Sequence, residues 1–226
     1  MELVKIAHIE CDFSEKFGIP RQSGLVKTKA RIVFEKEYAN PDAVRGLEGY
    51  SHLWLLWHFS KMEKEGFVPT VRPPRLGGNK RMGVFATRSP NRPNPIGLSS
   101  VELCGIEIKN GSPVLHIAGA DLLDGTPIFD IKPYLPFTDS HPDAIGGFAD
   151  EVKEHSQRVE IPEDVARGVN GESLLLIKEL LSQDIRPSYQ NDEDRVYGFT
   201  FGKYDVKFKS HDGVTSVIAI AIKDEP

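Results

Sequence analysis

Residues 51–59 read SHLWLLWHF and are the most informative stretch for the fold. Apolar side chains occupy both faces of an extended chain here, a pattern typical of a central strand that is covered on both sides. The segments on either side of this run are also predicted to be short strands separated by turns. The ranges that the sequence predicts as strands are Val4–Ile9, Thr28–Phe34, His52–Phe59, Val84–Thr87, Ser100–Ile108, Val114–Ala118 and Ile128–Ile131.

Helices are expected to be few in this first part of the chain. Asn40 is suited to cap a helix and Pro41 to occupy its first position, which predicts one short helix there. Many strands with few helices favour a closed or rolled-up sheet. We therefore expect a mainly β protein in which residues 1–150 form a β-barrel domain.

The last third of the chain has a different composition. A charged stretch between Gly146 and Glu163 marks the expected boundary, and residues 160–226 then indicate a small α+β domain. Apolar residues over 174–181 have helical spacing and are predicted to pack on a core. The chain breaks at Arg186-Pro187, after which a hairpin and a last strand are expected. These strands are predicted at Val196–Phe201, Tyr204–Phe208 and Val217–Ile222.

Composition excludes several classes of protein. The 226 residues are 39% hydrophobic, which is enough to build a core. No run approaches the ~18–20 apolar residues that span a bilayer, and no signal-peptide order opens the chain, so we expect a cytoplasmic protein. Cys11 and Cys104 have neither disulfide-framework nor zinc spacing. No metal is expected either, because EF-hand spacing is missing from Asp121, Asp124, Asp130 and Asp139.

A basic island lies within this acidic protein. The net charge is −5, yet no Asp or Glu occurs between Pro69 and Val101. Prolines and glycines shape this loop, and arginine matches planar anions with paired donors. The pattern indicates an anionic ligand, with a merely solvated loop as the alternative. The six cations of the island are Arg72, Arg75, Lys80, Arg81, Arg88 and Arg92.

Several familiar catalytic signatures are missing from the sequence. No Gly-x-Gly-x-x-Gly loop, Walker loop, paired metal histidines or Ser-His-Asp motif is found, which disfavours the common nicotinamide enzymes, ATP enzymes and hydrolases. Two polar turns are present instead, Pro20-Arg21-Gln22 and the DGTP sequence at 124–127. Taken alone, each is a turn without an assigned chemistry.

Separated motifs that occur in order resemble those of the TsaA-like tRNA methyltransferases, also called the tRNA adenine-37 N6-methyltransferases. They are VRPPRLGG at 71–78, TRS at 87–89 with RPNPIG at 92–97, DGTP at 124–127 with DIKPY at 130–134, and DIRPSY at 184–189. The last motif is similar to that of the bacterial two-domain form. The resemblance covers essentially the whole chain and is more specific than any single motif.

The resemblance implies a β-barrel methyltransferase, neither Rossmann-like nor knotted, that works as a homodimer with S-adenosylmethionine bound near the subunit interface. The implied reaction is methylation of N6 of threonylcarbamoyladenosine at position 37 of tRNA, beside the anticodon. The residues implied to contact the cofactor are Pro20, Arg21, Gln22, His58, Phe59, Arg88, Leu98, Asp124, Gly125, Thr126 and Pro127.

The chemistry of this reaction suggests roles for three residues. A carbamoylated N6–H is urea-like and more acidic than that of adenine, so loosening this proton is the catalytic task. We hypothesise that Arg92, or a neighbouring cation, binds the threonine carboxylate and that Asp130 or Tyr134 handles the proton. As alternatives, Asp130 is a hydrogen-bonding partner within a turn or strand, and Tyr134 is a core residue.

RNA contacts are expected to be modest and to weaken with salt. The candidates are Arg72, Arg75, Lys80, Arg81, Arg186 and Tyr189. For the last two, a helix-terminating turn at the domain boundary is the alternative to an RNA contact. Two other functions stay open. One is a non-catalytic module that binds S-adenosylmethionine or an anionic nucleotide, and the other is an RNA-binding accessory protein.

Overall fold

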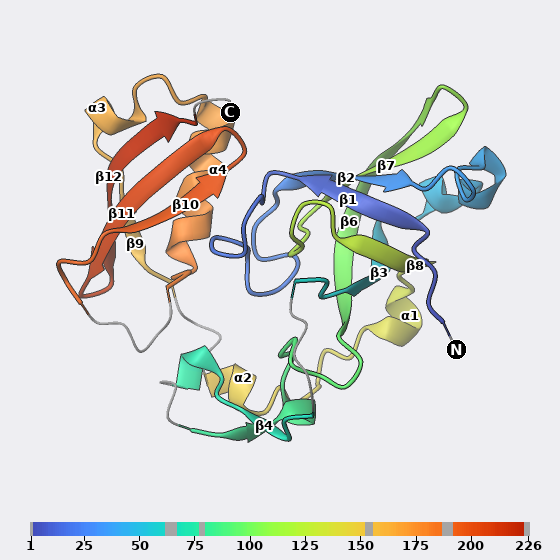
Figure 1. Cartoon of the computed structure of the whole chain (residues 1–226), viewed down its shortest axis with the longest axis horizontal. Coiled ribbons are helices and arrows are strands. Elements are labelled where there is room, and N and C mark those ends of the chain that lie inside the picture. Colours follow the sequence, from blue (N-terminus) through green and yellow to red (C-terminus); the bar gives the residue numbers. More distant parts are fainter. Residues whose placement is uncertain (1, 62–66, 77–79, 152–155, 187–191, 224–226) are drawn as a thin grey trace.

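The structure is a computed structural model that describes residues 2–61, 67–76, 80–151, 156–186 and 192–223. It contains a β-barrel and, beside it, a smaller sheet with helices (Figure 1). The strands are β1 (Ala7–Cys11), β2 (Lys29–Phe34), β3 (His52–His58), β4 (Thr70–Val71), β5 (Met82–Gly83), β6 (Ile96–Lys109), β7 (Ser112–Ala118), β8 (Pro127–Pro133), β9 (Arg158–Glu160), β10 (Tyr197–Phe201), β11 (Tyr204–His211) and β12 (Val214–Ile222). The helices are α1 (Pro136–Asp139), α2 (Phe148–Glu151), α3 (Glu163–Ala166) and α4 (Gly171–Ser182), with 3-10 turns at Pro41–Val44, Leu47–Gly49, Pro74–Leu76 and Val84–Ala86.

The barrel is a closed antiparallel sheet. Its strand order is β1-β2-β7-β6-β3-β8, and β8 returns to β1 through the pair Ala7↔Ile128. Closure leaves these strands without an unpaired edge, which is how many short antiparallel strands form a stable unit. The prediction of a mainly β protein with a barrel is confirmed.

Strand β3 is central, as predicted, because it pairs with β6 on one side and β8 on the other. Leu53, Leu55 and Trp57 point into the barrel and are buried, whereas the alternate residues Trp54 and Leu56 are half-buried. The expectation that both faces are covered therefore holds fully for the inner face and partly for the outer one. Strict alternation of this kind is what a barrel wall requires.

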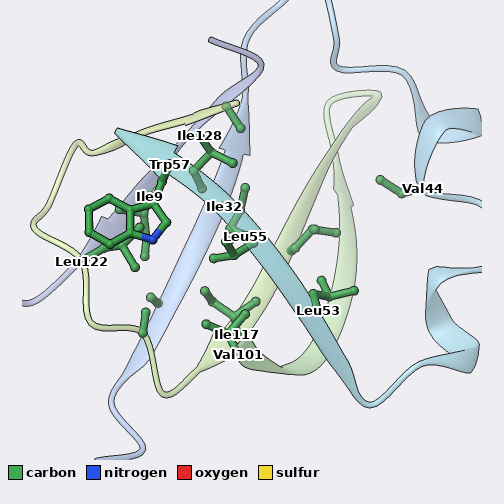
Figure 2. Close-up of a cluster of buried hydrophobic side chains, with 14 residues drawn as sticks. Ile9, Ile32, Val44, Leu53, Leu55, Trp57, Val101, Ile117, Leu122 and Ile128 are labelled. Carbon is green, nitrogen blue, oxygen red and sulfur yellow. The ribbon is translucent and has the colours of Figure 1, made fainter. Parts of the chain in front are cut away.

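The barrel interior is filled with side chains (Figure 2). The labelled members of this core are Ile9, Ile32, Val44, Leu53, Leu55, Trp57, Val101, Ile117, Leu122 and Ile128. Each fully buried aliphatic side chain contributes roughly 1.5–3 kcal/mol relative to an exposed one. Since the interior is packed in this way, a ligand has to bind at the rim and its loops rather than inside the barrel.

One predicted strand is wrong. Val84–Thr87 is not extended, and its first three residues form a 3-10 turn instead. The turn is closed by Thr87, whose backbone N–H and hydroxyl both donate to the Val84 carbonyl, at 3.1 and 2.9 Å. Val84 is buried, whereas Phe85 at the tip of the turn is 71% exposed.

The C-terminal unit is a sheet of order β10-β11-β12-β9 with helix α4 packed on it. The Asn170 side chain caps α4 by accepting from the Ser173 N–H at 2.8 Å. The predicted helix, hairpin and last strand are confirmed. The boundary placed between residues 150 and 160 stays a prediction, and Phe13 and Val26 from the β1–β2 loop are buried in the C-terminal core.

The contact between Gly97 and Trp57 should limit which residue β6 tolerates. A Cβ added at Gly97 would lie 2.2 Å from the indole ring. We expect Gly97→Ala to lower the free energy of unfolding by ~1–3 kcal/mol, because overpacking a filled core forces side chains or backbone to shift. Gly105→Ala is the control, since Gly105 lies on the same strand with open space around it. Equal urea midpoints for the two variants would contradict this reading.

Candidate active site

A cavity of about 550 Å³ lies at one end of the barrel. This volume is within the ~300–1,000 Å³ range of small-molecule sites. Its walls come from the β1–β2 loop, the end of β3, the basic loop before β6, the start of β6 and the loop before β8. The cavity therefore gathers segments that lie far apart in the sequence.

Most of the residues predicted to contact a cofactor line this cavity. They are Pro20, Arg21, Gln22, His58, Phe59, Arg88, Leu98 and Thr126. Asp124, Gly125 and Pro127 belong to the same turn as Thr126 but are not among the lining residues. Eight of the eleven residues implied by the resemblance are thus brought together by the fold around one cavity. The other three lie in the turn next to the cavity wall.

The DGTP turn has a structural task. The Asp124 carboxylate accepts from the Cys11 N–H at 2.9 Å, and the Gly125 N–H donates to the Ile9 carbonyl at 2.9 Å. Gly125 has φ 72°, a conformation that favours glycine. These bonds tie the turn to β1 and place the buried Thr126 at the cavity wall.

Arg88 and Gln22 connect two walls of the cavity. The Arg88 Nη1 donates to the Gln22 Oε1 at 2.6 Å. Arginine carries five N–H donors, so this bond orients the guanidinium while using a small part of its donor capacity. An oriented and exposed guanidinium is suited to a carboxylate or phosphate.

A buried hydrogen-bonded chain of three side chains reaches the cavity from the core. The Trp57 indole N–H donates to the Ser99 Oγ at 3.0 Å, and the Ser99 hydroxyl donates to the Asp121 Oδ1 at 2.5 Å. Burial raises the pKa of Asp121 above its ordinary value, while the Ser99 hydrogen bond and the charge of Arg88 oppose this shift. Among the described residues, Asp121 is the carboxylate that lines the cavity.

The sequence did not predict Asp121 as a residue of the cavity wall, because it was considered only as a metal ligand. The available signal was weak: an acidic residue next to the apolar run Leu122-Leu123 after Ala118-Gly119-Ala120.

In the part of the chain that the structure describes, no group of three or more His, Cys, Asp or Glu is arranged to hold a metal ion. Nor is any helix there both long and apolar enough to cross a membrane.

The two predicted proton acceptors are not among the residues that line the cavity, although Tyr134 packs against Trp54, which lines it. Asp130 forms an ion pair with Lys132 at 2.8 Å, and its Oδ1 accepts from the Ile131 N–H. Tyr134 packs against Trp54 and His52, with ring centroids 5.5 and 6.2 Å apart. The contacts of Asp130 match the structural alternative stated for it, whereas Tyr134 is half-buried and packs on the half-buried Trp54 rather than in the core.

Arg92 does line the cavity, and its guanidinium also supports the loop. Nη1 donates to the Thr87 and Val84 carbonyls at 2.7 and 3.3 Å, and the guanidinium lies 5.7 Å from the centre of the Phe85 ring. The side chain is therefore held in place from one side. Such fixation lowers the entropy lost when an anion binds.

The predicted RNA-contacting residues fall into three groups. Arg72, Lys80 and Arg81 are exposed, near the small ribbon of β4 and β5. Arg186 is only 11% exposed and forms an ion pair within the C-terminal unit. The side chain of Arg75 and the whole of Tyr189 lie outside the described residues.

Replacing the buried carboxylate should change how stability depends on pH. A raised pKa in the folded state means that the folded chain binds this proton more tightly than the unfolded chain, so stability falls as pH rises above about 4. The substitution Asp121→Asn removes the ionisable carboxyl group and with it this decrease in stability. We expect the variant to gain stability relative to the unmodified chain between about pH 4 and 7, measured by urea unfolding. Parallel pH profiles would rule out this effect.

Comparison with known proteins agrees with this geometry. Residues 8–140 match the family model of the tRNA-methyltransferase O N-terminal domain, and residues 150–223 match that of the TrmO C-terminal domain. The chain is 42% identical to the tRNA (adenine(37)-N6)-methyltransferase of Escherichia coli K12, over 96% of each chain. It is also 42% identical to the putative S-adenosylmethionine-dependent methyltransferase RcsF of Pseudomonas aeruginosa, over 89% of each chain.

A solved structure extends the comparison to the whole fold. The crystal structure of TrmO from Pseudomonas aeruginosa superimposes with a TM-score of 0.80 at 33% identity, over 98% of this chain and 97% of that one. The two family models together also cover both the barrel and the C-terminal unit. The chain therefore belongs to the tRNA-methyltransferase O family.

Proposed function

We propose that this protein transfers a methyl group from S-adenosylmethionine to N6 of adenosine 37 in tRNA, and that the threonylcarbamoyl form of this adenosine is the substrate. The observation that carries the proposal is the cavity at the barrel rim, which gathers Arg88, Leu98, Thr126 and the turn 20–22. The family relatives named above supply the reaction type, and the cavity supplies a place for it in this chain.

The lining residues fit the groups of such a methyl donor. When bound, S-adenosylmethionine supplies an electrophilic methyl group on a sulfonium. Arg88, oriented by Gln22, is suited to bind the carboxylate of the amino-acid part. Ile19, Phe59 and Leu98 offer apolar surface for the adenine ring.

Asp121 replaces Asp130 and Tyr134 as the proposed proton acceptor. It lines the cavity, and burial raises its pKa, which makes it a stronger base than an ordinary aspartate. The Ser99 hydroxyl donates to one of its oxygens and so fixes the orientation of the carboxylate. A kcat for Asp121→Asn equal to that of the unmodified chain would exclude this role.

Arg92 remains the proposed ligand of the threonine carboxylate. Its Nη1 is held by the Thr87 carbonyl, and the rest of the guanidinium is available at the cavity wall. The exposed Arg72, Lys80 and Arg81 would attract the phosphates of the anticodon region, an interaction that weakens as salt rises.

The proposal includes a cytoplasmic homodimer. Leu98 at the cavity is 55% exposed, and Phe85 beside Arg92 is 71% exposed. Apolar surface next to a site is what a second subunit would cover. Sedimentation analysis measures this directly, and a monomer at assay concentrations would contradict the dimer.

The function is tested by incubating the purified protein with S-adenosylmethionine labelled in the methyl group and with tRNA. Far more label is expected in tRNA from wild-type cells than in tRNA from cells that lack the threonylcarbamoyl group. Cofactor binding without transfer would favour the non-catalytic module. Binding of tRNA without cofactor binding would favour the accessory protein.

Arg92→Ala should reduce the preference for the modified base. We expect kcat/KM for threonylcarbamoyl tRNA to fall ~10–100-fold relative to that for unmodified tRNA, because a hydrogen bond to a charged group contributes about 1.5–3 kcal/mol. Arg31→Ala is the matched control, since Arg31 pairs with Glu10 on the outside of the barrel. An unchanged ratio, even with lower overall activity, would show that Arg92 supports only the loop.

A further inference from the structure

The turn that follows α4 contains a nearly buried ion pair. Arg186 Nε and Nη2 donate to the two carboxylate oxygens of Asp184 at 2.8 and 3.2 Å, and the two side chains are 11% and 15% exposed. Arg186 Nη1 also donates to the Ser210 carbonyl at 3.2 Å. Buried pairs of this kind persist when further hydrogen bonds satisfy them, as here, and they fix the backbone that carries them.

This backbone has an unusual conformation. Asp184 has φ 45°, in the left-handed region that residues other than glycine seldom adopt. The turn directs the Asp184 and Arg186 carbonyls to the same point, where the Arg21 Nη2 donates to both, at 3.0 and 2.6 Å. A cation at the C-terminal end of α4 is also favoured by the helix dipole.

Arg21 belongs to the wall of the cavity. Its neighbour Gln22 binds Arg88, and all three line the cavity. A continuous set of polar contacts therefore runs from the Asp184–Arg186 pair, through Arg21 and the adjoining peptide, to Gln22 and Arg88.

The rest of the β1–β2 loop is anchored in the same unit. In Figure 1 this loop, drawn in blue, reaches from the barrel towards β10 and α4. The Gly202 N–H donates to the Asp12 carbonyl at 2.9 Å, and the Thr200 N–H donates to the Glu15 carboxylate at 2.7 Å. Phe13 is buried in the C-terminal core. This cavity wall is thus built on the C-terminal unit as much as on the barrel.

We propose that Asp184 and Arg186 are positioning residues for the methyl-donor site. They hold the two carbonyls that bind Arg21, and through Gln22 they fix the guanidinium of Arg88. The inference rests on the proposed function, because it assigns the donor to this cavity. It gives the C-terminal unit a task in cofactor binding that does not require direct contact with RNA.

The test measures the Kd of S-adenosylmethionine by isothermal titration calorimetry, together with KM for tRNA. We expect Arg186→Ala to raise the Kd by about tenfold, within the ~5–150-fold range of coupling between separate sites, with KM for tRNA little changed. Arg158→Ala is the matched control, because Arg158 forms an exposed ion pair with Glu160 in the same unit. Its Kd should equal that of the unmodified chain.

A double-mutant cycle separates positioning from general loosening. If Arg186 acts through Arg21, the double variant Arg21→Ala/Arg186→Ala should bind no more weakly than Arg21→Ala alone. Fold-changes that multiply would overturn the inference. A higher KM for tRNA with an unchanged Kd would also overturn it, in favour of a direct RNA contact by Arg186.

Asp184→Asn keeps the test decisive if Arg186→Ala does not fold. Asparagine tolerates a positive φ and retains one acceptor for Arg186, so this variant should fold and raise the Kd less than tenfold but measurably. A Kd equal to that of the unmodified chain in every folded variant would overturn the inference alone. Absence of binding by the unmodified chain would overturn the proposed function with it.

Discussion

The indole of Trp57 imposes the constraint on which the barrel and its cavity both depend. Its ring fills the core at the end of β3, so the residue opposite on β6 has to be Gly97, since a larger side chain would overlap it. Its buried N–H needs an acceptor, which Ser99 provides. The Ser99 hydroxyl is then directed at Asp121. One buried aromatic residue thereby sets both a strand pairing and the orientation of a carboxylate at the site.

A packed barrel restricts where a site can form. Because the interior is full, the cavity is built from loops at the rim, and loops need support to hold a defined shape. The DGTP turn is supported by a hydrogen bond to β1, and the basic loop is supported by the hydrogen bonds of Arg92 to the Val84 and Thr87 carbonyls. The β1–β2 loop is supported by the C-terminal core, where Phe13 is buried.

The sequence predicts the features that depend on local pattern. The apolar run 51–59 predicted β3, and Asn40 before Pro41 predicted a short capped helix, which the structure forms as the 3-10 turn Pro41–Val44. Both signals are carried by neighbouring residues. That Asp130 does not line the cavity could not be predicted from the sequence, because the face of the barrel wall that a residue occupies depends on strand pairing, and Asp130 pairs with Leu56. Asp121 could not be recognised as a cavity residue either. Ser99, which donates to Asp121, and Trp57 become neighbours only through the pairing of β3 with β6.

Basic residues that cannot be distinguished in the sequence differ in their burial, and therefore in the interactions that they make. Exposed cations such as Arg72 and Arg81 keep their hydration, and the field of such a charge extends over a distance set by salt. Arg92 is bound to fixed carbonyls, so it loses mobility and gains a defined direction. Arg186 is nearly buried, so it binds protein groups instead of water, and the carboxylate of Asp184 compensates its charge. Attraction of RNA and positioning of a reacting group therefore place opposite demands on arginine, and solvent exposure decides which of them a given residue can meet.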